Sequence, residues 1–113
     1  MIKIGTRGSA LALWQAHFVA GQLTQEHTIV TIKTKGDRIQ NVSFDKIEGK
    51  GFFTKELEEA LLSGTIDMAV HSMKDLPTDD TPGLTIAAVT KREDPSDVII
   101  IRPEAYRANH WFP

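Results

Sequence analysis

The stretch Ile66-Asp67-Met68-Ala69-Val70-His71-Ser72-Met73-Lys74-Asp75-Leu76-Pro77 decides the fold expected for this chain. Its first, mostly apolar half predicts a buried strand, and Pro77 with the turn-forming segment behind it ends regular structure. Ser72, Lys74 and Asp75 therefore follow directly on the end of a strand. Ligands usually bind at the carboxyl ends of strands in α/β sheets, so these side chains form a candidate site. A turn with solvated charges is the alternative, because exposed ion pairs are common and weak.

Strand and helix patterns alternate along the rest of the chain. Strands are predicted over 2–4, 28–34, 66–70, 84–89 and 97–101, and helices over 10 to about 25 and over 55–63. A strand, a helix and a strand in succession favour parallel pairing through a βαβ unit. We therefore expect an α/β fold with a mixed, mostly parallel sheet flanked by helices.

Both helices have recognisable ends. Ser9 is the expected N-cap of the first helix and Thr54 that of the second, while Gly64 suits the position after the second helix. Gly21 weakens the first helix. Apolar side chains recur in the first helix at the spacing of an amphipathic face: Leu11, Trp14, Phe18, Val19 and Leu23.

Residues 35–51 interrupt this regular pattern. They are rich in Gly and charge and poor in apolar residues, which predicts a long mobile loop. Loops of this length inside compact domains are often functional lids. Lys46 and Lys50 would then bring cations to an anionic ligand, although solvated lysines on a mobile loop are the simpler interpretation.

Composition narrows the class of protein. The 113 residues fit one domain, and 41% hydrophobic residues is ordinary for a globular chain. A net charge of −2 does not point to nucleic acid or membrane as a partner, and no apolar run reaches the length of a membrane span. The chain has no Cys, and its four His lack metal-ligand spacing, so no metal site is expected. The N-terminus enters a strand pattern without a signal-peptide layout, which makes a cytoplasmic protein the default.

The loop between the first strand and the first helix is a second candidate site. Free backbone N–H groups and the positive end of the helix dipole favour an anion there, and Arg7 adds a planar fork suited to carboxylate or phosphate. The glycine pattern is neither a P-loop nor a dinucleotide fingerprint. A Ser9 that only caps the helix and a solvated Arg7 would explain the same residues.

Asp75 is the residue with the clearest chemical potential. A carboxylate in a dry cleft can stabilise a developing cation or move a proton. Lys74 beside it would keep it ionised, and His71 is expected to anchor the loop through a hydrogen bond. Together the two candidate sites predict a small ligand that carries negative charge.

Four blocks of the sequence resemble the porphobilinogen deaminase (hydroxymethylbilane synthase) family. In the family's order they read IGTRGSALALWQA (4–16), GKGFFTKELE (49–58), DMAVHSMKDLP (67–77) and KREDPSD (91–97). The resemblance covers residues 2 to about 101. It divides the chain into an incomplete N-terminal α/β domain, 1–101, and a hinge or linker, 102–113, toward a missing second domain.

The resemblance implies a transferase of porphyrin and haem biosynthesis. Such an enzyme joins four porphobilinogen molecules into a linear tetrapyrrole and releases ammonia at each step. The product grows on a dipyrromethane cofactor that is bound through a thioether to a Cys. The implied fold is that of type II periplasmic binding proteins, with two α/β domains around a cleft and a third domain that carries the Cys.

The resemblance also assigns roles by motif position. Asp75 would be the catalytic carboxylate, which stabilises positive pyrrole intermediates and assists proton movement. The residues expected to bind cofactor or substrate carboxylates are Arg7, Ser9, Ser72 and Lys74, and those expected on a flexible loop over the cleft are Lys46 and Lys50.

This chain departs from the family in length and in its lack of Cys. We expect an N-terminal fragment that is inactive alone and that self-associates through an exposed edge or its aromatic tail, although the family is usually monomeric. A small-anion binding module of the periplasmic type is the first alternative, and it would not need Asp75. A phosphoribosyl-type transferase is the second, and it would need a phosphate cradle richer in Gly and Thr than residues 5–9.

Overall fold

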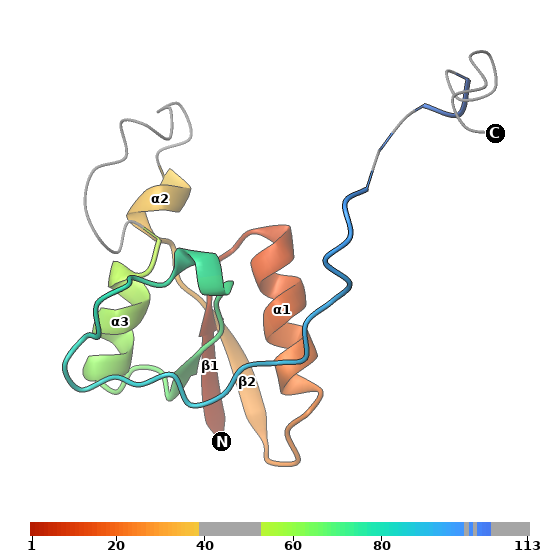
Figure 1. Cartoon of the computed structure of the whole chain (residues 1–113). Coiled ribbons are helices and arrows are strands. Elements are labelled where there is room, and N and C mark those ends of the chain that lie inside the picture. The colour runs from red at the N-terminus through yellow and green to blue at the C-terminus, as the bar shows by residue number, and fades with distance from the viewer. Residues whose placement is uncertain (39–52, 99, 101, 105–113) are drawn as a thin grey trace.

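The computed structural model of this chain describes residues 1–38, 53–98, 100 and 102–104. In chain order its elements are β1 (Ile2–Thr6), α1 (Ala10–Ala20), β2 (His27–Thr31), α2 (Lys35–Arg38), α3 (Lys55–Leu62), β3 (Met68–Ala69) and the 3₁₀ helix η2 (Met73–Asp75). They form a small α/β fold with helices packed around a parallel sheet (Figure 1).

β1 is the central strand of a three-stranded sheet with the order β2-β1-β3. It pairs in parallel with β2 along its whole length, and with β3 through Ile4 opposite Met68 and Gly5 opposite Ala69. Along the sheet, β2 lies next to one edge of β1 and β3 next to its other edge, so the two crossovers run in opposite directions. Because crossovers are right-handed, α1 and α3 then lie on opposite faces of the sheet, as Figure 1 shows. This reversal of strand order places the carboxyl ends of β1 and β3 side by side, where α/β sheets usually bind ligands.

The core between β1 and α1 is built around small side chains. Ile4 is fully buried and packs with Ala16 and Ala20, and Ala12 is buried on the same helix. These alanines recur every four residues, so they lie on one face of the helix and let α1 approach the sheet closely.

The apolar spacing seen in the sequence marks a different face of α1. Leu11, Trp14 and Phe18 are 55%, 57% and 43% exposed, and the rings of the last two stack at 5.5 Å. Leu23 does pack against the core. Because this helix is apolar on nearly every side, hydrophobic periodicity could not identify the face that meets the sheet. The helix also ends at Ala20 rather than near residue 25. Gly21 takes the C-cap position directly after Ala20.

The other face of β1 packs against α3. Gly5 follows Ile4 and therefore faces the opposite side of the sheet. A Cβ atom at Gly5 would collide with the buried side chain of Ile66 and lie 3.2 Å from Cδ2 of Leu57. The close packing of α3 on the sheet thus depends on a missing side chain at this position.

Gly5→Ala is expected to lower the free energy of unfolding by about 1–3 kcal/mol, because the added methyl group overpacks the face toward α3. Urea unfolding followed by tryptophan fluorescence measures this change. Gly21→Ala is the matched control. Gly21 has helical φ and ψ, and a Cβ there would come no closer than 3.5 Å to its neighbours, so stability should rise by about 0.4–1 kcal/mol. Equal effects of the two substitutions would contradict the packing role of Gly5.

Of the two helix-end signals predicted for α3, the structure confirms the one at the C-terminal end only. Gly64 has φ +77°, the left-handed conformation expected just after a helix. Thr54 occupies the N-cap position, but the predicted side-chain cap is wrong, because its hydroxyl makes no capping hydrogen bond. Its φ and ψ of −124° and −17° differ from the extended conformation that points an N-cap hydroxyl at the helix.

The predicted strands 84–89 and 97–101 do not form in the described residues. Residues 84–98 adopt no helix or strand, and the chain leaves the domain as an extended segment (Figure 1). Ile86, Val89 and Val98 are 60%, 69% and 80% exposed. β-branched residues favour a strand only where a neighbouring strand and a core are available to pack against, and this segment has neither in the described part of the chain.

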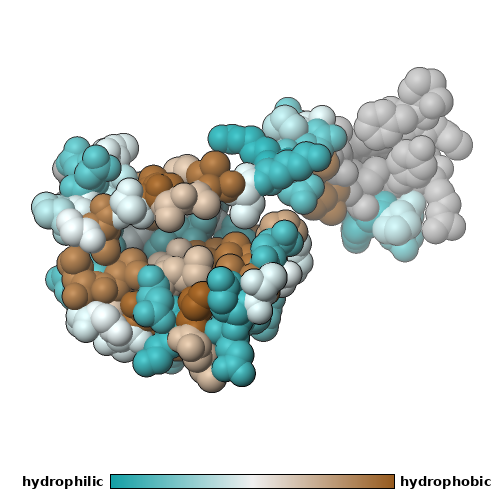
Figure 2. Space-filling view, turned by 90° about the horizontal axis from the view of Figure 1, so that it is seen from below, coloured by the Kyte–Doolittle hydropathy of each residue, from teal (hydrophilic) through white to brown (hydrophobic). Residues whose placement is uncertain are grey.

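Hydrophobic residues consequently remain on the surface. Figure 2 shows several of them on the side of the domain seen from below. Among the described residues, no helix combines the length and apolar character needed to cross a membrane.

Candidate functional site

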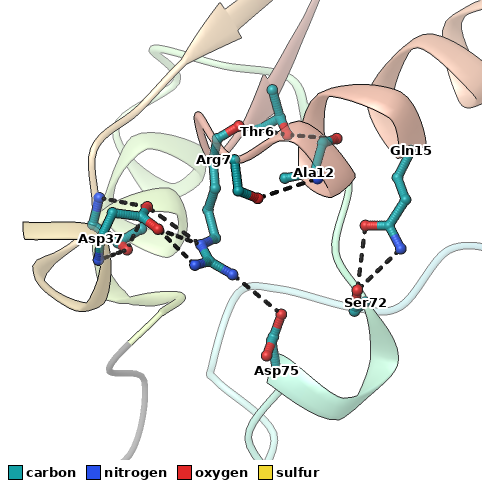
Figure 3. Close-up of polar contacts among 9 residues, drawn as sticks. Thr6, Arg7, Ala12, Gln15, Asp37, Ser72 and Asp75 are labelled. Atoms are coloured by element: carbon teal, nitrogen blue, oxygen red, sulfur yellow. Dashed lines mark hydrogen bonds and ion pairs between the residues drawn. The ribbon is translucent and has the colours of Figure 1, made fainter. Parts of the chain in front are cut away.

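Arg7 is the first residue after β1 and the centre of a polar cluster (Figure 3). The fully buried Thr6 before it donates a 3.1 Å hydrogen bond to the carbonyl oxygen of Ala12, which fixes the loop against the first turn of α1. The Arg7 side chain is only 18% exposed. Its Cζ lies 4.4 Å from the centroid of the Phe53 ring, so one face of the guanidinium is covered.

Asp37 of α2 holds one edge of that guanidinium. Arg7 Nη2 lies 2.6 Å from Asp37 Oδ1, and Nε donates to Oδ1 and Oδ2 at 3.1 and 3.3 Å. Burial alone would raise the pKa of Asp37, but the hydrogen bonds from Arg7 and Thr34 outweigh it and leave the pKa below its ordinary value. Asp37 is therefore a fixed anion beside the arginine.

Thr34 fixes Asp37 in turn. The Thr34 hydroxyl donates to Asp37 Oδ2 at 2.9 Å, and the Asp37 backbone N–H donates to Thr34 Oγ1 at 3.3 Å. Asp37 Oδ2 also accepts a 3.3 Å hydrogen bond from the Thr34 backbone N–H, which completes a reciprocal capping box with Asp in the place of the usual Glu. The sequence predicted a loop over 35–51. That prediction is wrong over 35–38, which form the single helical turn α2.

Asp75 approaches Arg7 from the other side. Its Oδ2 lies 3.5 Å from Arg7 Nη1, and its side chain is 17% exposed. The 3₁₀ turn η2 orients it, with the Asp75 N–H donating to the Ser72 carbonyl oxygen at 3.0 Å. The cation beside Asp75 is thus Arg7, not the predicted Lys74, which is exposed. Successive side chains of a 3₁₀ turn point about 120° apart, so adjacent residues do not share a direction.

Ser72 is joined to α1. Gln15 Nε2 donates to Ser72 Oγ at 3.0 Å, and the Ser72 hydroxyl can donate to Gln15 Oε1 at 3.3 Å. The pair ties the exit of β3 to the helix that follows β1, as Figure 3 shows. Ser72 therefore faces the same end of the sheet as Arg7.

Ser9 is confirmed as the N-cap of α1. Its Oγ accepts a 3.2 Å hydrogen bond from the Ala12 backbone N–H. The hydroxyl predicted to bind an anion is thus engaged in capping, while the residue itself is exposed at the helix N-terminus.

Nδ1 of His71 is buried and has no hydrogen-bond partner in the described part of the chain, so the hydrogen bond predicted for His71 is not made by this nitrogen. Burial is the largest influence and lowers the pKa of His71. The Asp75 charge raises it and the Arg7 charge lowers it further, and the net result is a pKa below the ordinary value. The His71 ring is consequently neutral at pH 7.

The structure brings together three of the predicted site residues, Arg7, Ser72 and Asp75. Lys46 and Lys50 lie outside the described residues. Sequence reasoning missed Asp37, Gln15 and Phe53 as their partners. The Thr34-x-x-Asp37 pattern could have revealed Asp37 as part of a capping box. Gln15 is one of two polar residues, with His17, in the mostly apolar helix α1.

Comparison with known proteins identifies the family of this chain. The family model described as "Porphobilinogen deaminase, dipyromethane cofactor binding domain" matches residues 2–111. Relatives named porphobilinogen deaminase include those of Syntrophomonas wolfei, 57% identical over 88% of this chain, and Syntrophus aciditrophicus, 60% identical over 88%. The relative from Pelobacter propionicus is 49% identical over 99% of the chain.

The chain spans about a third of the length of these curated relatives, with 34–37% of each covered. The family match does not favour the alternative of a small-anion binding module. Because this family model matches nearly the whole chain, the chain belongs to the porphobilinogen deaminase family.

Proposed function

We propose that this chain supplies the catalytic carboxylate of a hydroxymethylbilane synthase, which polymerises four porphobilinogen molecules into a linear tetrapyrrole with loss of ammonia. The approach of Asp75 to Arg7, at 3.5 Å between Oδ2 and Nη1, is the observation that carries this proposal. It puts an acidic group and a carboxylate-binding group together at the point where the strand order reverses.

Asp75 has the chemistry that the reaction needs. Positive charge develops on the pyrrole as ammonia leaves, and a fixed carboxylate in a partly buried site stabilises that charge. The same carboxylate can accept a proton when two pyrroles join. Its 17% exposure keeps the competing solvation by water small.

Arg7, Ser9, Ser72 and Lys74 form the proposed binding set for carboxylates. Among the described residues, Arg7 Nη1 contacts Asp75 at the long distance of 3.5 Å, so this nitrogen retains donor capacity for a ligand. The exposed side chain of Lys74 and the Ser72 hydroxyl are further donors at the same end of the sheet. Lys46 and Lys50 are proposed to add cations from the segment outside the described residues.

These residues fit a dipyrromethane cofactor, because its carboxylate side chains require a guanidinium and hydroxyl donors of this kind. When bound, that cofactor supplies the primer to which pyrroles are added. The chain has no Cys, so the thioether would be made by a residue outside it. Arg7 and Ser72 would hold carboxylates of the cofactor or substrate, and Asp75 would remain available to the reacting pyrrole.

The fold proposed for the longer protein is that of the type II periplasmic binding proteins, with residues 1–101 as part of its first domain and 102–113 as the hinge. The parallel sheet with β1 between β2 and β3 supports this assignment. A cytoplasmic location belongs to the same proposal.

To test this proposal, porphobilinogen is added to the purified 113-residue chain, and both its binding and the formation of tetrapyrrole are measured. We expect porphobilinogen to shift the NMR signals of Arg7 and Ser72, and a pyrrole without carboxylates to leave them unchanged. We expect no tetrapyrrole absorbance after oxidation, since the chain spans only part of its relatives. Tetrapyrrole formation would show that the chain is active alone. Signals that respond equally to both pyrroles would overturn the binding assignment.

A further inference from the structure

The two carboxylates beside Arg7 make unequal contacts with it. Asp37 takes the Nε and Nη2 edge with contacts of 2.6, 3.1 and 3.3 Å, whereas Asp75 makes one contact of 3.5 Å to Nη1. Charge-assisted hydrogen bonds are usually 2.7–2.9 Å, and 3.5 Å is near the limit of any hydrogen bond. Arg7 is therefore tightly bound on one edge and loosely bound on the other.

Further contacts hold both Asp37 and the guanidinium of Arg7 in place. Asp37 is locked by the capping box with Thr34, which is fully buried. Phe53 covers a face of the same guanidinium. A guanidinium fixed at Nε and Nη2 can present Nη1 in only one direction, toward Asp75.

From these contacts we infer that Asp37 is a positioning residue, which holds Arg7 so that a ligand carboxylate displaces Asp75 from Nη1. The inference rests on the proposed function for the identity of the ligand, but not for the role of Asp37. The exchange replaces one carboxylate at Nη1 with another and releases the Asp75 carboxylate for its work on the pyrrole. No covalent step is involved.

A positioning role for Asp37 and simple electrostatics predict opposite effects of its neutralisation on anion binding. Asp37 adds negative charge to an anion site, so its neutralisation should strengthen anion binding if charge alone matters. A positioning role predicts weaker binding, because the freed guanidinium must be ordered by the ligand itself. Asp75→Asn makes the same change in charge without loosening the Nε edge, which makes it the matched control.

The first measurement needs no ligand. The Nε–H of Arg7, assigned with the Arg7→Lys variant, is followed by NMR for its exchange with solvent. Loss of a charged hydrogen bond in Asp37→Asn should speed this exchange about tenfold or more. Asp75→Asn should leave it within about twofold of the original rate, since the Asp37 contacts persist. Unchanged exchange in Asp37→Asn, or equal acceleration in both variants, would overturn the positioning role.

The second measurement titrates the same proteins with succinate as the carboxylate probe. We expect the affinity to fall about tenfold in Asp37→Asn and to rise by a similar factor in Asp75→Asn. Thr34→Val removes the hydroxyl that holds Asp37 without changing any charge, so it should weaken binding in the same direction as Asp37→Asn. Stronger binding by Asp37→Asn would show that Asp37 acts only as a charge.

The two measurements separate the two proposals. Succinate that binds neither the original chain nor Asp75→Asn would overturn the ligand exchange and count against the proposed function. The Nε–H exchange would still decide whether Asp37 positions Arg7. The amide spectrum of each variant confirms that it is folded before its data are compared.

Discussion

Asp75→Asn is expected to lower the rate of tetrapyrrole synthesis about 10²- to 10³-fold in a protein that carries this chain as its N-terminal segment. Asparagine keeps the shape of the side chain but removes the negative charge that stabilises the cationic pyrrole. A suitable test protein is a chimera in which this chain replaces the matching residues of the Syntrophomonas wolfei relative. Turnover of porphobilinogen at saturating concentration is the quantity to measure, because the charge acts in the transition state.

The control for this substitution is Asp80→Asn, which removes an equal charge from an exposed residue of the following loop. It should leave turnover unchanged. Asp75→Glu keeps the carboxylate and should retain more activity than Asp75→Asn. If the Asp75→Asn chimera turns over substrate as fast as the unsubstituted one, Asp75 is not the catalytic carboxylate.

Arg7→Ala is expected to lower the free energy of unfolding of the 113-residue chain by about 2–4 kcal/mol. The substitution removes the partner of two carboxylates that are 19% and 17% exposed, and leaves both with much of their solvation lost. Arg38→Ala is the matched control. Arg38 follows Asp37 on α2 but is exposed, so its loss should change stability by less than about 0.5 kcal/mol. Urea unfolding of both variants measures the difference, and equal losses would contradict a structural role for the ion pair.

The effect of Arg7→Ala should depend on pH in a defined direction. The pKa of Asp37 is lowered in the folded chain, so its pairing stabilises the fold at pH values above the ordinary carboxyl pKa. That stabilisation is lost as the pH falls through the lower, folded pKa, because the carboxyl group then becomes protonated. The stability difference between the original chain and Arg7→Ala should therefore shrink below about pH 4. A difference that stays constant down to pH 2 would show that Asp37 is not the main partner.

The sequence by itself determined the class of fold and predicted the place of the candidate site. Alternating strand and helix patterns predicted a parallel α/β arrangement, and β1, β2, α1, α3 and β3 all occur where they were expected, with shifted ends. Ser9 and Gly64 mark helix boundaries through local backbone chemistry, which acts over a few residues and is visible in sequence. The motif around residues 67–77 was enough to identify Asp75 as the candidate catalytic residue.

Tertiary structure alone decided which side chains meet. Arg7 and Asp75 are 68 residues apart, and Gln15 and Ser72 are 57 apart, so only the reversal of strand order at β1 brings them together. The buried face of α1 and the unpaired segment after residue 84 were likewise beyond sequence reasoning. A helix that is apolar all round has no preferred face until a sheet is present, and a β-branched run forms a strand only beside another strand. Local propensity is a property of the chain, whereas burial and pairing depend on neighbours that only the fold supplies.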